Sequence, residues 1–98
     1  MNYLLFIDEA VEDELNEATE YYEKLQEGLG TRLYDDFDDT LDYIRKAPLG
    51  FQVEIENFRC IQLARFPYVI VYKVEATTIV VYRFINARKK PEKRYKKK

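Results

Sequence analysis

The sequence contains no histidine, no serine and only one cysteine, Cys60. Without histidine and serine, a Ser-His-Asp triad and a Cys-His pair are both excluded, and the commonest metal ligand is missing. One cysteine excludes an internal disulfide and a multi-cysteine metal site, and it suits a reducing compartment. Acid–base chemistry would therefore need Asp, Glu, Lys, Tyr or Arg. We expect neither a metal nor a cofactor.

Long apolar runs and a secretion signal are also missing. The longest apolar runs fall far short of the roughly 20 residues that a membrane-spanning helix needs. The first ten residues, MNYLLFIDEA, lack the basic start and the small-residue cleavage site of a signal peptide. We therefore expect a cytoplasmic protein without a membrane partner.

The chain is long enough, and apolar enough, to bury a core. Its 98 residues are 47% hydrophobic and include 15% aromatics, which matches the size and composition of one ordinary domain. We expect a single domain over residues 1–98. Residues 91–98 are expected to form a flexible tail, because eight residues rich in lysine offer little to bury.

Charge is distributed very unevenly along the chain. Residues 1–57 hold 16 acids and four bases, a net charge of −12, whereas residues 58–98 hold 12 bases and two acids, a net charge of +10. The total of −2 hides this split. Such an asymmetry suggests that two surfaces of the protein face different partners.

The first half of the chain has the pattern of two helices. After a short apolar strand at residues 2–7, apolar residues recur every three or four positions from Asp8, which is a suitable N-cap. Gly28 and Gly30 indicate a C-cap and a turn. This first helical stripe consists of Val11, Leu15, Ala18, Tyr22, Leu25 and Leu29.

A second helix is predicted over residues 31–46, with Thr31 as its N-cap and Pro48 beyond its end. Its apolar stripe is Leu33, Phe37, Leu41 and Ile44. The aspartates are expected to form a solvated face rather than a cation site, because on a helix they fan outward: Asp35, Asp36, Asp38, Asp39 and Asp42. The two helices joined by a glycine turn make an αα-hairpin.

From residue 51 the apolar period becomes two, which predicts strands. The expected strands are 51–55, 58–65, 68–74 and 78–85, with turns at 56–57 and 75–77. Connections this short favour antiparallel pairing. The predicted fold is therefore α+β: an N-terminal strand, an αα-hairpin, a mainly antiparallel four-stranded meander and a basic C-terminal tail.

Several short motifs, in this order and spacing, resemble the RelE/ParE toxin superfamily of type II toxin–antitoxin systems, and most closely its ParE-like, plasmid-stabilisation branch. The resemblance covers nearly the whole chain. It departs from the family at Asn86, where histidine is usual. The motifs are A-x-x-Y-Y-E at 18–23, G-L-G-x-R-L at 28–33, I-x-x-x-P at 44–48, Arg59, R-F-P-Y-x-I-x-Y at 65–72 and N-A-R-K-K-P at 86–91.

The resemblance implies a toxin that arrests growth and is neutralised by a cognate antitoxin. Two targets remain open: DNA gyrase, inhibited by binding alone, or mRNA, cleaved at the ribosome. For cleavage, arginine would stabilise the developing charge, and lysine or tyrosine would act as base, since histidine is lacking. The catalytic candidates implied for a nuclease are Arg59, Arg65, Arg88, Lys89 and Tyr95.

The remaining basic residues are candidates for binding nucleic acid or an antitoxin: Arg83, Lys90, Lys93 and Arg94. Arg59, Arg65 and Arg83 lie on predicted strands and could converge on one side of the sheet to hold phosphates. The alternative is that these arginines pair with the many acids, and that the lysines are merely solvated. A toxin-fold protein retained only as a binding module is also compatible with Asn86 and the acidic helices.

Overall fold

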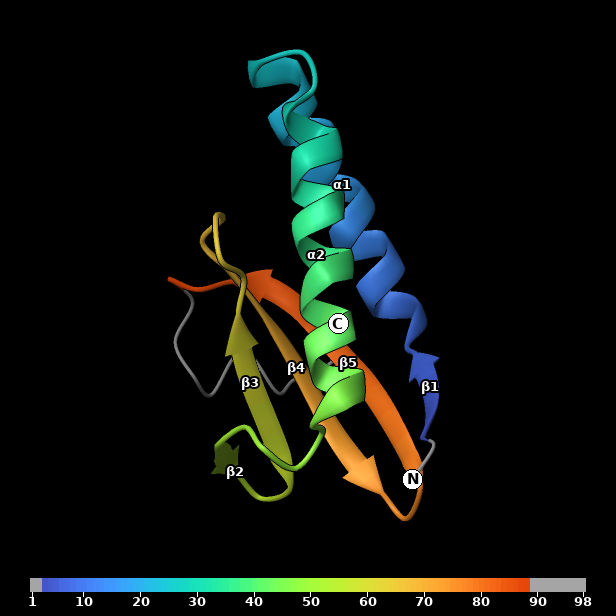
Figure 1. Cartoon of the computed structure of the whole chain (residues 1–98). Helices are drawn as coiled ribbons and strands as arrows, with labels where there is room; N and C mark the ends of the chain where they lie inside the picture. The colour runs from blue at the N-terminus through green and yellow to red at the C-terminus, as the bar shows by residue number, and fades with distance from the viewer. Residues whose placement is uncertain (1–2, 89–98) are drawn as a thin grey trace.

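The computed structural model describes residues 3–88, apart from the side chain of Ile55. The chain forms two layers, a helical hairpin and a five-stranded sheet (Figure 1). In chain order the elements are β1 (Leu4–Ile7), α1 (Glu9–Leu25), α2 (Leu29–Lys46), β2 (Val53–Ile55), β3 (Phe58–Gln62), β4 (Tyr68–Glu75) and β5 (Thr78–Asn86). The α+β fold predicted from the sequence is confirmed.

The sheet has the order β1-β5-β4-β3-β2. The last four strands form the expected antiparallel meander, and β1 joins its far edge parallel to β5, with Leu4 opposite Thr78 and Ile7 opposite Val81. The β2–β3 turn places Glu56 at φ 51°, and the β4–β5 turn places Ala76 at φ 55°. β3 ends at Gln62, earlier than the predicted 58–65.

The hydrophobic core lies between the hairpin and one face of the sheet. All four residues of the predicted α2 stripe are buried, with Val11, Leu15 and Ala18 from α1. Ile70, Tyr72, Ile79, Val81 and Phe84 meet them from β4 and β5. Burying side chains of this size supplies most of the folding free energy, at about 25 cal/mol per Å² of apolar surface.

The hairpin turn differs from the prediction in detail. α2 begins at Leu29, so that Gly28 is its N-cap at φ 87° and Gly30 lies within the helix. Thr31 is therefore an interior helical residue and not the cap. The carboxylate of Glu23 accepts hydrogen bonds from the Gly28 and Gly30 amides, both at 2.9 Å, and so satisfies donors that a helix start leaves without partners.

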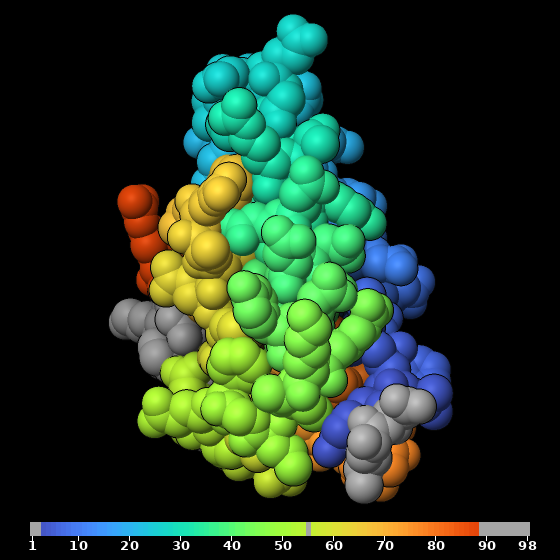
Figure 2. All heavy atoms as spheres, in the orientation of Figure 1, coloured from blue at the N-terminus to red at the C-terminus, as the bar shows by residue number. Residues whose placement is uncertain are grey.

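The far end of the hairpin projects beyond the sheet. Figure 2 shows this tip, coloured cyan, as a narrow extension above the broader body. Leu25, predicted on the apolar stripe, is 61% exposed there because the sheet does not reach it. Among residues 3–88, no helix is both long and apolar enough to cross a membrane.

Candidate functional site

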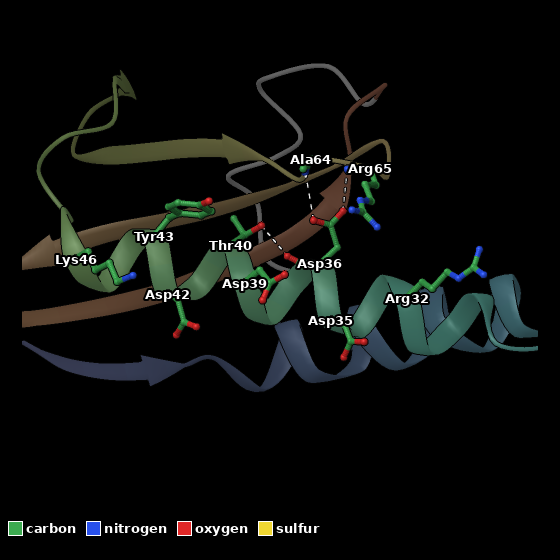
Figure 3. A pocket seen from close by; sticks show the side chains of 10 residues that line it. All are labelled: Arg32, Asp35, Asp36, Asp39, Thr40, Asp42, Tyr43, Lys46, Ala64 and Arg65. Carbon is green, nitrogen blue, oxygen red and sulfur yellow. Dashed lines mark hydrogen bonds between the residues drawn. The ribbon is translucent and has the colours of Figure 1, made fainter.

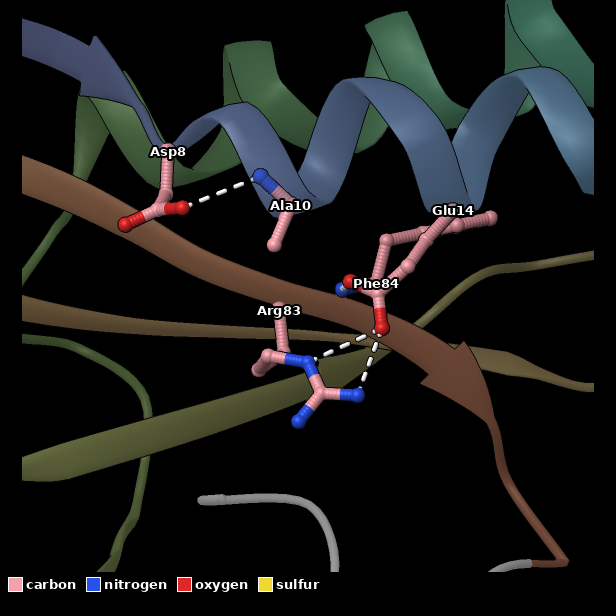
Figure 4. Close-up of polar contacts among 5 residues, drawn as sticks. All are labelled: Asp8, Ala10, Glu14, Arg83 and Phe84. Atoms are coloured by element: carbon pink, nitrogen blue, oxygen red, sulfur yellow. Dashed lines mark hydrogen bonds and ion pairs between the residues drawn. The ribbon is translucent and has the colours of Figure 1, made fainter. Parts of the chain in front are cut away.

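Arg83 is buried against α1 and is not part of an exposed basic surface (Figure 4). Its Nε and Nη2 atoms donate to Glu14 Oε2 at 2.9 Å and 2.6 Å. The other carboxylate oxygen of Glu14 accepts the Phe84 amide at 3.0 Å. Arg83 and Glu14 are only 3% and 8% exposed. In the described fold Arg83 therefore faces Glu14 and not solvent, and its role in binding stays a prediction.

The position of Glu14 explains this arrangement. β1 pairs with β5 only as far as Val81, because the chain then turns into α1 through Asp8, whose carboxylate caps the helix by accepting from the Ala10 amide. Beyond that point β5 has no neighbouring strand on this side among residues 3–88, and Glu14 accepts the amide hydrogen bond that a strand would take. The sequence could have indicated that Glu14 is buried, since it falls on the same helical face as Val11 and Ala18.

Arg59 also makes contacts within the fold. Its Nη1 atom donates to the Phe51 carbonyl and, at 3.3 Å, to the Leu49 carbonyl. These carbonyls belong to the segment between α2 and β2, so Arg59 holds that segment to β3. Arg59 thus has a structural role in the fold, independent of any ligand.

Arg65 lies on the loop between β3 and β4, beside an open cleft of about 540 Å³ along α2 (Figure 3). Asp36 fastens this loop: its carboxylate accepts the Ala64 and Arg65 amides at 3.3 Å and 2.8 Å. Asp36 is thus buried, at 7% exposed, and does not belong to the solvated face predicted for it. The side chain of Arg65 is exposed.

A second groove, of about 620 Å³, lies between α1 and the end of β5. We call it the α1–β5 groove, and its lining is mostly aromatic and apolar: Ala18, Tyr21, Tyr22, Leu25, Pro67, Tyr68, Phe84 and Ile85, with Glu14, Glu17, Asn86 and Arg88. Tyr22 contacts Phe66 and Tyr68 edge to face, at ring distances of 5.1 Å and 6.2 Å. Such rings present a large, rigid contact area.

Asn86 orients the polar end of this groove. Its Oδ1 atom accepts the Arg88 amide at 2.8 Å, and its side chain also hydrogen-bonds the Tyr68 hydroxyl. Burial raises the pKa of Tyr68, the neighbouring Tyr22 and Tyr21 raise it further, and the bond to Asn86 partly opposes them. Tyr68 is therefore neutral at physiological pH and unsuited to act as a base there.

The structure does not bring the predicted arginines together. Arg59 contacts the segment after α2, Arg83 pairs with α1, and Arg65 and Arg88 line different clefts. In the described fold, one surface does not bring together Arg59, Arg65 and Arg83. Five other candidates, Lys89, Lys90, Lys93, Arg94 and Tyr95, lie outside the described residues. Within residues 3–88, no group of acids and cysteine is arranged to hold a metal.

Comparison with solved structures identifies the fold. A chain of the structure titled "Chromosomal ParDE TA system from P. aeruginosa" superposes with a TM-score of 0.76 and 17% sequence identity, over 86% of this chain and 95% of that one. The chain has a ParE-like fold. No protein-family model matches this ParE-like chain, and no curated protein matches it in sequence. The fold that the motifs predicted is thus confirmed by shape, although the identity is low.

Proposed function

We propose that the protein is the toxin of a type II toxin–antitoxin system and arrests growth until a cognate antitoxin binds it. The fold shared with a chain of the ParDE TA system carries this proposal. The ordered motifs along the sequence, from the Tyr-Tyr-Glu of α1 to the Arg-Phe-Pro-Tyr before β4, support it independently.

We favour inhibition of DNA gyrase by binding over cleavage of mRNA. Cleavage needs several cations converging on one phosphate together with a base. Two of the three candidate strand arginines, Arg59 and Arg83, already make contacts within the fold, and Asn86 replaces the histidine of the family. The α1–β5 groove has the aromatic core and the arginine at its rim that are typical of protein–protein contacts.

The nuclease remains the second candidate, because Arg65 and Arg88 are both exposed near the ends of neighbouring strands. Lys89 and Tyr95 could supply the base in that case. The antitoxin is proposed to bind the basic C-terminal region through Lys90, Lys93 and Arg94, since antitoxin segments are often acidic and opposite charges speed association.

Brief induction in a bacterial host separates these possibilities. We expect growth arrest with a DNA-damage response, intact mRNA by primer extension, and loss of supercoiling activity when purified protein is added to gyrase. New cuts in mRNA that disappear in Arg65→Ala and Tyr95→Phe would instead establish the nuclease. If induction causes no arrest, the protein is a binding module and the toxin proposal fails.

Two exposed tyrosines provide a matched pair of variants for the groove. Tyr21, 58% exposed, lines the α1–β5 groove, whereas Tyr34, 53% exposed, lies on α2 and does not line it. We expect Tyr21→Ala to weaken gyrase inhibition at least tenfold, in line with about 1.4 kcal/mol lost from an aromatic contact, and Tyr34→Ala to leave it unchanged. Equal effects would mean that the groove is not the contact surface.

A further inference from the structure

β1 presents an unpaired edge. It lies at the end of the sheet and pairs only with β5 among the described strands. The Leu4 and Asp8 amides point inward, donating to Thr77 and Val81 carbonyls, both at 2.9 Å. Because successive peptide groups of a strand point in opposite directions, those of Leu5 and Ile7 are directed outward. This edge can accept another strand.

The side chains beside this edge are unusually apolar for an exposed position. Tyr3 and Leu5 pack toward the core, so that Leu4 and Phe6 stand on the face of the sheet opposite the helices. They are 63% and 60% exposed, and Ile7 is 38% exposed. Natural proteins prevent other strands from pairing with such edges by placing charges, prolines or bulges there. Residues 4–7, Leu-Leu-Phe-Ile, contain none of these devices.

We propose that β1 pairs antiparallel with β1 of a second copy of this chain, with the two-fold axis beside Leu5. The outward peptide groups of Leu5 then pair with those of the other copy's Leu5. This register places Leu4 of each copy opposite Phe6 of the other on the uncovered face. The most exposed side chains of β1 thus cover each other, and the two sheets become continuous.

Charge at the two ends of the strand favours a copy of this chain as the occupant. The acids Glu9 and Glu12 of the first turn of α1 follow the C-terminal end of β1. Arg45 and Lys46 end α2, and α2 ends toward the end of the sheet where β1 begins (Figure 1). Arg45 also pairs with Asp42 of the same helix at 3.4 Å. An antiparallel copy brings that basic helix end toward these acids. Glu75, at the same end, is already paired with Lys73 at 3.5 Å.

The proposed dimer is weak. Stable interfaces bury about 800 Å² on each partner, which is more than a four-residue strand alone provides. We therefore expect a concentration-dependent dimer with a Kd on the order of 10–100 μM.

Sedimentation equilibrium of the full chain, from about 1 μM to 1 mM, tests the proposal. We expect Phe6→Lys to raise the Kd at least tenfold, because two lysines then meet two leucines. Val53→Lys is the control: Val53 lies on β2 at the opposite edge and is 42% exposed, so the dimer should persist. A monomeric wild type, or a dimer disrupted only by Val53→Lys, overturns the proposal.

Cross-linking tests the register without relying on a disruptive variant. In a Cys60→Ala background, a mixture of Leu4→Cys and Phe6→Cys chains should form a disulfide-linked dimer on mild oxidation, because these positions face each other across the axis. Either variant alone should cross-link far less, since equivalent residues are diagonal, roughly 7–8 Å apart. Equal cross-linking in all three samples would overturn the register and the proposal.

Discussion

At the scale of single residues, the environment of a side chain decides its role more than its type does. Arg83 and Arg65 are both arginines near the sheet, yet one is buried in an ion pair and the other is exposed beside a cleft. Among the acids, Glu14 and Asp36 are buried and accept backbone amides, whereas most of their neighbours on the helices are solvated. These two acids position β5 and the β3–β4 loop.

Glu14→Gln should destabilise the fold strongly. The amide can still accept from the Phe84 N–H, but it leaves the guanidinium of Arg83 buried without a counter-charge. We expect the free energy of unfolding to fall by about 3–5 kcal/mol, as for other broken buried pairs, measured by urea denaturation.

The matched control is Glu20→Gln, an exposed acid on the same helix, which should change stability by less than about 0.5 kcal/mol. The double variant Glu14→Gln with Arg83→Leu should recover part of the lost stability, because the leucine removes the buried, unpaired charge of Arg83. Equal effects of the two glutamine variants would contradict a role for the ion pair in stability.

Tyr72 should make the fold sensitive to high pH. It is fully buried, and its hydroxyl donates to the Pro48 carbonyl at 2.7 Å. Burial raises its pKa from 10.0 to about 12, and nearby Arg59 partly opposes the rise. Because the folded pKa exceeds the unfolded one, the stabilising contribution is complete below pH 10 and is lost as the pH rises toward 12.

The comparison with Tyr72→Phe isolates this effect. At pH 7 the variant should be about 1 kcal/mol less stable, since the Pro48 carbonyl loses its donor. Between pH 10 and 12 the wild type should lose stability faster, so that the two denaturation curves approach each other. Curves that stay parallel over this range would show that Tyr72 does not titrate as expected.

At the scale of elements, the hairpin depends on how closely its helices approach. A Cβ atom at Gly30 would lie 2.7 Å from the Thr19 carbonyl oxygen of α1, which is closer than atoms can pack. The glycine is therefore needed for packing, while Gly28 is needed for its positive φ. The G-L-G motif reports the geometry of the hairpin and not a binding site.

Gly30→Ala should destabilise the protein by about 1–3 kcal/mol, because the helices must separate to accommodate the methyl group. Thr31→Ala should have no cost, or a gain of a few tenths of a kcal/mol, since alanine is the better interior helical residue. Had Thr31 been the N-cap, its loss would cost about 1 kcal/mol. Urea denaturation of both variants tests the start of α2 observed here.

At the scale of the whole molecule, stability should decline from the sheet toward the tip of the hairpin. β4 and β5 form the longest pairing and supply the sheet side of the core, whereas the last turn of α1 lies beyond the sheet. Regions with few buried apolar contacts open most readily.

Hydrogen exchange should show this gradient directly. The amides of residues 23–25 should exchange at least tenfold faster than those of Ile70 and Val71, because the former open with the tip and the latter only with global unfolding. Measurement by NMR at neutral pH resolves both sets. Equal protection would indicate that the hairpin and the sheet unfold as one unit.

The charge asymmetry also takes a spatial form at this scale. Exposed acids line both helices of the hairpin, whereas the exposed bases Arg65, in the β3–β4 loop, and Arg88, just after β5, lie near the end where the chain leaves the sheet. The residues of the proposed antitoxin contact follow Arg88 in the sequence and lie outside the described residues. An acidic hairpin would be repelled by ribosomal RNA, which agrees with the protein target proposed above.

The sequence by itself determined the order of the elements, the antiparallel meander and the apolar faces of the helices, because these follow from local periodicity and short connections. It also carried the motifs that predicted the fold. Only the tertiary structure decided that Arg83 pairs with Glu14, that Asp36 fastens the loop of Arg65, and that Arg59 binds two carbonyls. Glu14 and Arg83 are 69 residues apart, and local spacing carries no information on which distant charges burial will bring together.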